Sequence, residues 1–132
     1  MQEIPVLCIE WVPNFDVIKT KIMSAIFTDA NFEASVVQSD KLSIVDFWAT
    51  WCPPCLAIGP VIDALAKDYE GQVNVGKLNA DENPNVSVAY GVTNLPVVLF
   101  MYKGKVVDRQ VGAAPKSVYD KKVRKLLENG LQ

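Results

Sequence analysis

The stretch WATWCPPCLAIGPV, residues 48–61, decides the fold of this chain. Two of its residues, Cys52 and Cys55, stand three positions apart and are separated only by Pro53 and Pro54. Proline is well tolerated in the first turn of a helix, because the amide hydrogen that it lacks has no intrahelical partner there. The pattern therefore predicts a helix that begins just after the first cysteine.

The residues on either side of this motif predict a strand followed by that helix. Residues 42–49 are nearly all apolar and rich in strand formers, as expected of a central strand covered on both faces of a sheet. The helix continues to Gly71, and Pro60 inside it predicts a kink, because the carbonyl of Leu56 loses its partner. Apolar residues mark one face of this helix at Ile58, Ile62, Leu65 and Tyr69.

A shorter strand and helix precede this unit. Residues 24–29 predict a strand, and residues 30–37 predict a helix. Either Thr28 or Asp29 is expected to cap this helix, because a short oxygen-bearing side chain can accept a bond from the free amides of the first turn. Strand, helix and strand in this order favour a crossover within one sheet.

The second half of the chain begins with another strand and helix. Residues 73–80 predict a strand that alternates apolar and polar positions. Asn83 is expected to cap a short helix that Pro84 opens and Gly91 closes. This pair extends the alternation of strands and helices.

The last three elements break the alternation. Residues 96–102 and 105–111 are separated only by Lys103 and Gly104, so they are expected to form an antiparallel hairpin. A final amphipathic helix begins near Pro115. The resulting order βαβαβαββα predicts an α/β fold with a central mixed sheet flanked by helices.

Composition limits the possible partners. The chain has 132 residues and a formal net charge of -2, which predicts a single domain without a field that attracts nucleic acid or anionic membranes. Its longest apolar run, residues 95–102, is far shorter than the roughly 18 to 20 residues of a membrane-spanning helix. The first residues make a poor secretion signal, so a cytoplasmic location is expected.

Histidine is absent, and this excludes several mechanisms. Neither a Ser-His-Asp triad nor a Cys-His pair can form within the chain, and no His-containing metal site is possible. Three cysteines are too few for a four-cysteine zinc site in one chain, so no metal is expected. The chemistry that remains is that of the thiols themselves.

The strand and helix around the two cysteines predict two reactive groups, an ionised thiol at Cys52 and a buried acid at Asp46. At the start of a helix, Cys52 faces the positive end of the helix dipole, and the amide of Cys55 is the remaining donor because two prolines precede it. These groups favour the thiolate. Asp46 is an acid in an otherwise apolar strand, so burial should raise its pKa and let it exchange protons near neutral pH.

The sequence DFWATWCPPC, followed by NLPV and VGA in this order and spacing, resembles the thioredoxin family. Lys77 lies between the first two motifs, and the resemblance runs over residues 23–127. It implies a thioredoxin-like domain over residues 23–132, with residues 1–22 as an N-terminal extension. Thioredoxins are a known example of a lowered thiol pKa in a C-x-x-C motif.

The resemblance also implies a mechanism. Thioredoxins hold no bound cofactor; their redox-active disulfide, here Cys52 with Cys55, reduces protein disulfides and receives electrons from a separate flavin reductase, the thioredoxin reductase. Cys52 would be the nucleophile and Cys55 the resolving thiol. Asp46 would exchange the proton, with Lys77 as its charge partner.

A substrate-binding surface is implied in the same way. Thioredoxins have a cis-proline at the position of Pro96, and the backbone at Leu95 is then free to pair with an extended substrate segment. A monomer is expected. The implied substrate-binding residues are Trp51, Pro53, Pro54, Gly91, Val92, Leu95, Pro96 and Gly112.

Alternative interpretations stay open at this point. The pair of cysteines could be a structural disulfide, and the domain could be a dedicated reductase of few partners, as in tryparedoxins or cytochrome maturation. It could also be a non-catalytic interaction module with a thioredoxin fold. Outside the motif, Cys8 is interpreted as a small apolar residue and Trp48 as part of the core, while residues 1–22 either precede a start at Met23 or cover an apolar patch.

Overall fold

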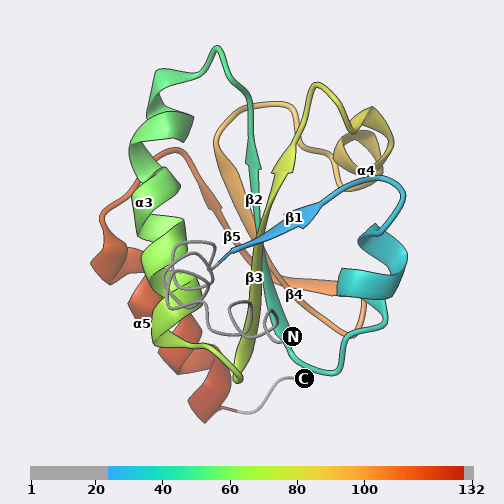
Figure 1. The fold of residues 1–132 in the computed structure, drawn as a ribbon. Helices are drawn as coiled ribbons and strands as arrows, with labels where there is room; N and C mark the ends of the chain where they lie inside the picture. Colours follow the sequence, from blue (N-terminus) through green and yellow to red (C-terminus); the bar gives the residue numbers. More distant parts are fainter. Residues whose placement is uncertain (1–23, 130–132) are drawn as a thin grey trace, which may run out of the picture.

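The computed structural model describes residues 24–129, so the predictions for residues 1–22 and for Cys8 lie outside the described residues. It confirms the predicted α/β fold and order of elements, with five strands in one mixed sheet and helices on both of its faces (Figure 1). The strands are β1 (Ala25–Phe27), β2 (Leu42–Trp48), β3 (Val73–Asn79), β4 (Val97–Tyr102) and β5 (Lys105–Val111). The helical elements are the π-helix η1 (Glu33–Val37) and the α-helices α3 (Pro53–Asp68), α4 (Pro84–Ala89) and α5 (Lys116–Glu128).

Strand β2 lies at the centre of the sheet, as its apolar sequence predicted. The strand order is β1-β3-β2-β4-β5, and β2 pairs parallel with β3 and antiparallel with β4. Every residue from Leu42 to Phe47 is buried. Trp48 was predicted in the core; it is only half-buried at the end of the strand, where it packs against the buried cluster of Ala49, Cys52 and Cys55.

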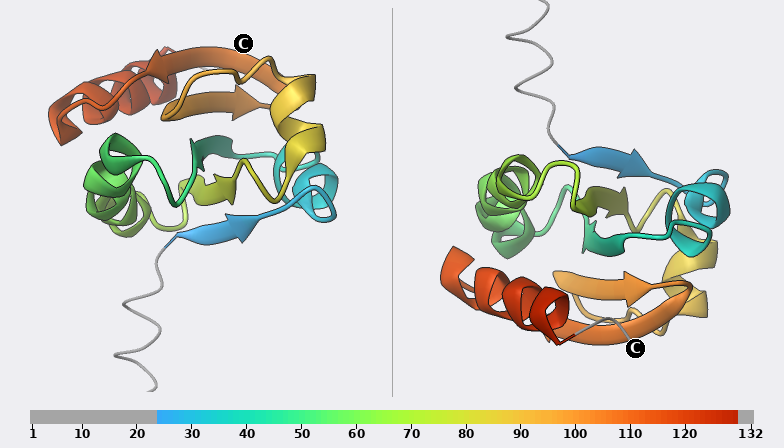
Figure 2. Two further views of the ribbon diagram at one scale, coloured as in Figure 1. Left: turned by 90° about the horizontal axis from the view of Figure 1, so that it is seen from above. Right: turned by 90° about the horizontal axis from the view of Figure 1, so that it is seen from below.

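The helices divide between the two faces of the sheet (Figure 2). Helices α3 and α5 cover one face, and η1 and α4 cover the other. Side chains from β2 alternate between the two apolar clusters that result. The α3/α5 face buries Leu42, Ile44, Ile58, Ile62, Leu65, Phe100, Tyr119 and Val123, among others. The η1/α4 face buries Phe27, Phe32, Val36, Val45, Phe47, Leu78, Leu99 and Met101, among others.

The first short helix has one of the two predicted caps, whereas the second does not have the predicted cap. Oγ1 of Thr28 accepts a hydrogen bond from the amide of Asn31 at 3.1 Å, in the turn that leads into the π-helix η1, although Phe32 at the N-cap of η1 itself makes no side-chain bond. The Asp29 carboxylate instead accepts hydrogen bonds from the amides of Asn85 (3.1 Å) and Val86 (2.9 Å), at the start of α4. Asn83 occupies the N-cap position of α4 but its side chain makes no capping bond. The carboxylate of Asp29 supplies the acceptor that Asn83 was expected to provide.

The C-terminal hairpin has the predicted form. Strands β4 and β5 pair antiparallel, and the turn residues Lys103 (φ 52°) and Gly104 (φ 80°) both have left-handed backbone conformations. Such a two-residue turn matches the natural twist of the strands that it joins. Helix α5 then returns across the sheet and buries Tyr119 and Val123 completely.

Candidate active site

A disulfide joins Cys52, just before α3, to Cys55 in the first turn of that helix. The turn between β2 and α3 lies at the top of Figure 1. The two Cα atoms are 5.2 Å apart, and Cys52 is the N-cap of α3. Its Sγ accepts a hydrogen bond from the amide of Cys55 at 3.3 Å, the donor that the two prolines leave available. Both residues are buried, with 4% and 2% of their surface exposed.

The peptide bond between Leu95 and Pro96 is cis, which confirms the prediction for this proline. Leu95 packs against the disulfide and Ala49. The amide of Gly112 donates to the carbonyl of Pro96 at 2.8 Å, so two of the predicted substrate-binding residues are joined by a backbone hydrogen bond. Within residues 24–129, the backbone groups of Leu95 have no hydrogen-bond partner. They are available to an added strand.

A shallow hollow of about 240 Å³ lies beside the disulfide and brings together Trp51, Val92 and Leu95. Trp51 is 66% exposed, and its indole N–H donates to Oδ2 of Asp81 at 2.7 Å. Gly91 does not line this hollow; it follows α4 with φ 66°, a conformation that favours glycine. Asp81 was missed from the sequence, because it lies 30 residues beyond the tryptophan that it holds.

The carboxyl group of Asp46 lies in a second hollow, of about 260 Å³, which Cys55 also lines. Asp46 is 1% exposed, and its Oδ1 has no hydrogen-bond partner in the part of the chain that the structure describes. Burial raises the pKa of Asp46 to about 7; Lys77 lowers it and Asp63 raises it further. A carboxyl group beside Cys55 can therefore gain or lose a proton near neutral pH.

The register of the sheet places Lys77 directly beside Asp46 on the neighbouring strand. Among the described residues, however, the ion pair of Lys77 is with Asp63 on α3, at 3.1 Å, and not with Asp46. Asp63 was missed from the sequence. Its spacing could have revealed it, because Gly59 and Asp63 follow Cys55 at intervals of four and continue one face of the helix.

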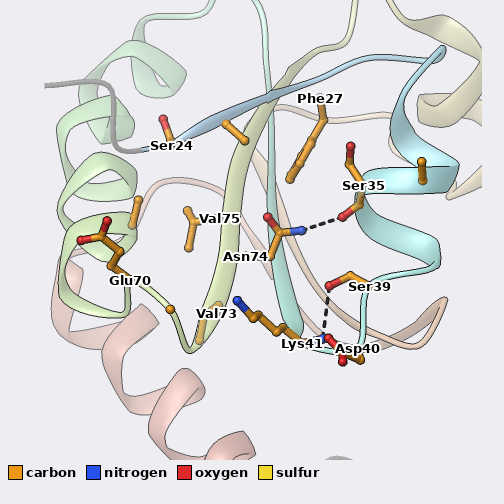
Figure 3. Close-up of a pocket in the computed structure, with 14 residues that line it drawn as sticks. Ser24, Phe27, Ser35, Ser39, Asp40, Lys41, Glu70, Val73, Asn74 and Val75 are labelled. Atoms are coloured by element: carbon orange, nitrogen blue, oxygen red, sulfur yellow. Dashed lines mark hydrogen bonds between the residues drawn. The ribbon is translucent and has the colours of Figure 1, made fainter. Parts of the chain in front are cut away.

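A larger hollow, of about 680 Å³, lies beneath β1, away from the cysteines (Figure 3). The side-chain nitrogen of Asn74 donates to the carbonyl of Ser35 at 2.7 Å and to the hydroxyl of Ser43 at 3.1 Å. In the described residues, no cluster of three or more Cys, Asp or Glu side chains is placed to hold a metal ion. No helix of residues 24–129 has the length and apolarity needed to cross a membrane.

The sequence model of the family described as Thioredoxin matches residues 23–125. The chain belongs to the thioredoxin family. It is 53% identical over 96 residues to thioredoxin 2 of Chlorobaculum tepidum, an alignment that covers 73% of this chain and 88% of the relative. It is also 43% identical over 100 residues to thioredoxin 1 of Nostoc sp., covering 76% of this chain and 94% of the relative.

Family membership and the disulfide together define the activity. Thioredoxins are protein-disulfide reductases, and their redox-active cysteine pair works without a bound cofactor. The chain is therefore a dithiol-disulfide oxidoreductase of the thioredoxin type, with Cys52 and Cys55 as its cysteine pair.

Proposed function

We propose that Cys52 attacks the disulfide of a protein substrate and that Cys55 completes the exchange. The Cys52 thiolate forms a mixed disulfide with one substrate sulfur and releases the other as a thiolate. The Cys55 thiolate then attacks the Sγ of Cys52, closes the intramolecular disulfide and releases the second substrate thiolate. Two electrons pass to the substrate, and the protein is left in the oxidised form described above.

The position of Cys52 at the start of α3 carries this assignment. As the N-cap residue, its sulfur lies at the positive end of the helix dipole and already accepts the Cys55 amide. Both interactions stabilise a negative charge on sulfur more than a neutral thiol. Cys55 lies within the helix and lacks this advantage.

Asp46 serves as the proton acceptor for Cys55. Lys77 is its charge partner, because the nearby ammonium group lowers the pKa of Asp46 and so favours the carboxylate form. A base with a pKa near the working pH is the most effective in proton transfer, and the pKa of Asp46 is raised to about 7 by burial. The hollow that Asp46 and Cys55 share gives the proton a path between them.

The substrate binds as an extended segment beside the cis-proline. The unpaired backbone of Leu95 provides the hydrogen bonds, and exposed Trp51 provides an apolar platform. This surface is bordered by the loop that follows α4 and by the prolines of the active-site turn. The proposed substrate-binding residues are Trp51, Pro53, Pro54, Gly91, Val92, Leu95, Pro96 and Gly112.

The expected partners follow from this chemistry. Oxidised protein must be reduced again before another turnover, and a separate flavin-containing thioredoxin reductase would supply the electrons. We expect a cytoplasmic monomer, since the surface needed is that of a single chain. Such a protein would transfer electrons from the reductase to many protein disulfides and would maintain the redox state of the cell.

Reduction of insulin, followed by turbidity, tests this function. Cys52→Ser should abolish the activity, and Cys55→Ser should accumulate a mixed disulfide with the substrate that can be detected by mass. Cys8→Ser is the matched control and should retain full activity. Insulin reduction by Cys52→Ser at the rate of the unchanged protein would overturn the proposal.

A further inference from the structure

Asp63 and Lys77 form an ion pair at the mouth of the hollow that contains Asp46. Nζ of Lys77 lies 3.1 Å from Oδ1 of Asp63, and the two side chains are 26% and 41% exposed. The same oxygen of Asp63 accepts a hydrogen bond from the hydroxyl of Ser24 at 2.6 Å. The carboxylate of Asp63 is therefore held by two donors from outside its own helix, Ser24 just before β1 and Lys77 on β3.

This ion pair determines where the ammonium group of Lys77 lies. The backbone of Lys77 is the register partner of Asp46, so the two side chains leave adjacent strands on the same face of the sheet. The end of the lysine nevertheless reaches α3, where Nζ would lie 3.7 Å from a Cβ atom at Gly59. The side chain of Lys77 therefore leaves the backbone beside Asp46, and its ammonium group lies at the carboxylate of Asp63.

We propose that Asp63 is a positioning residue for proton exchange at Asp46. Its carboxylate restrains the ammonium group of Lys77 at the wall of the hollow and so limits how far this cation neutralises the buried carboxylate. The inference rests on the proposed function of Asp46 in the exchange reaction. Without this restraint, Lys77 would stabilise the charged form of Asp46 more strongly.

The charges that face Asp46 from each packed element support this role. Lys77 approaches from β3, Cys55 and Asp63 from α3, and Tyr119 from α5. Burial, followed by the charge of Asp46, raises the pKa of Tyr119, so its hydroxyl stays neutral near pH 7. In the oxidised protein Cys55 does not titrate. Lys77 and Asp63 are thus the charges that modulate Asp46, and they act in opposite directions.

The substitution Asp63→Asn tests the proposal, because asparagine keeps an oxygen acceptor and removes only the charge. Titration of the Asp46 carboxyl carbon by NMR in the oxidised protein should show its pKa lowered by roughly half a unit or more. Asp68→Asn is the matched control, since Asp68 lies on the same helix and pairs instead with Lys116 at 2.6 Å. An Asp46 titration that is the same in Asp63→Asn as in Asp68→Asn would overturn the proposal.

A second comparison tests whether Asp63 acts through Lys77. Lys77→Met should raise the pKa of Asp46, because the nearby cation is lost. In that background, Asp63→Asn should lower the pKa by clearly less than it does in the unchanged protein. An equal shift in both backgrounds would show that Asp63 acts only through its own field, and positioning of the lysine would be refuted.

The rate of insulin reduction supplies the functional readout. If Asp46 must be deprotonated to accept the proton of Cys55, Asp63→Asn should shift the acid limb of the rate profile to lower pH, with a gain of about two- to threefold at one pH unit below its midpoint. The NMR titration involves no substrate. A changed titration with an unchanged rate profile would refute the role of Asp46 in catalysis while keeping its electrostatic link to Asp63.

Discussion

Strand β2 contributes side chains to both faces of the sheet, and the two rows differ in charge. On the η1/α4 face it contributes Ser43, Val45 and Phe47, which are all completely buried, and the Ser43 hydroxyl accepts a hydrogen bond from the side-chain amide of Asn74. On the α3/α5 face it contributes Leu42 and Ile44 and then a carboxyl group, Asp46. The first row is thus uncharged, and its one polar group is hydrogen-bonded, whereas the second places an ionisable group in the hollow that Cys55 also lines. Reactivity is obtained by placing a single acid in one of two otherwise uncharged rows.

The apolar face should respond most strongly to loss of volume. Phe47→Ala removes a fully buried ring and should lower the free energy of unfolding by about 3 to 5 kcal/mol. Chemical denaturation measures this loss. Ile26→Ala, at a residue 76% exposed, is the control and should change stability by only about 0.5 kcal/mol. Similar losses at the two sites would contradict close packing around Phe47 as a source of stability.

Asp46, on the α3/α5 face, should make the stability of the protein depend on pH. The pKa of Asp46 is about 7 in the folded protein and 3.8 ordinarily, so the folded state binds this proton more tightly than the unfolded state. The contribution of Asp46 to stability is therefore greatest below pH 4 and is lost as the pH rises through 7. Asp46→Asn stays neutral and should be more stable than the unchanged protein by up to about 4 kcal/mol at pH 8, and about equal to it at pH 4.

Denaturation of both proteins across this pH range measures the difference. The gain from Asp46→Asn should grow steadily between pH 4 and pH 7 and then level off. A gain of the same size at every pH would mean that the charge of the Asp46 carboxylate does not destabilise the protein. The contrast between the two faces would then lose its electrostatic basis.

A glycine on the η1/α4 face tests how closely that face is packed. A Cβ atom at Gly76 would lie 2.5 Å from Cε2 of Phe27, too close for either group to remain in place. Gly76→Ala should therefore lower the free energy of unfolding by about 1 to 3 kcal/mol. Adding Phe27→Leu should recover part of the loss, and a double variant less stable than the sum of the two single variants would contradict the steric explanation.

The smallest effect is expected where the η1/α4 face relies on a single cap. The Asp29 carboxylate accepts two amide hydrogen bonds at the start of α4, so Asp29→Ala should lower the free energy of unfolding by about 1 kcal/mol. Asp29→Asn keeps an oxygen acceptor and should lose less. An equal loss in both variants would show that the capping oxygen is not what stabilises α4.

Much of this fold could be predicted from local pattern. The apolar run of β2, the two prolines after Cys52 and the two-residue turn at Lys103 each act through neighbours in the sequence. Such signals fix the type and order of elements. The buried acid of β2 followed from the same signals, whereas the redox-active disulfide at the start of α3 was implied by the resemblance to thioredoxins.

The missed contacts join residues that are far apart in the sequence. Asp29 caps α4 from 57 residues away, and Asp81 holds Trp51 across 30. Lys77 pairs with Asp63 from an adjacent helix, which depends on how α3 lies on the sheet. Local pattern gives the elements but not the distances between their surfaces, so side chains that bridge two elements become visible only in the structure.

The two sulfurs of the active-site turn should differ in reactivity, because only Cys52 is the N-cap of α3. Reduced protein should be alkylated at increasing pH, and the modified cysteines should be identified by peptide mass. Cys52 should react first, with a midpoint clearly below the value of about 8.5 for an ordinary thiol, while Cys55 remains protected. Equal modification of both cysteines, or a midpoint for Cys52 at or above about 8.5, would contradict the activation of this sulfur by the start of α3.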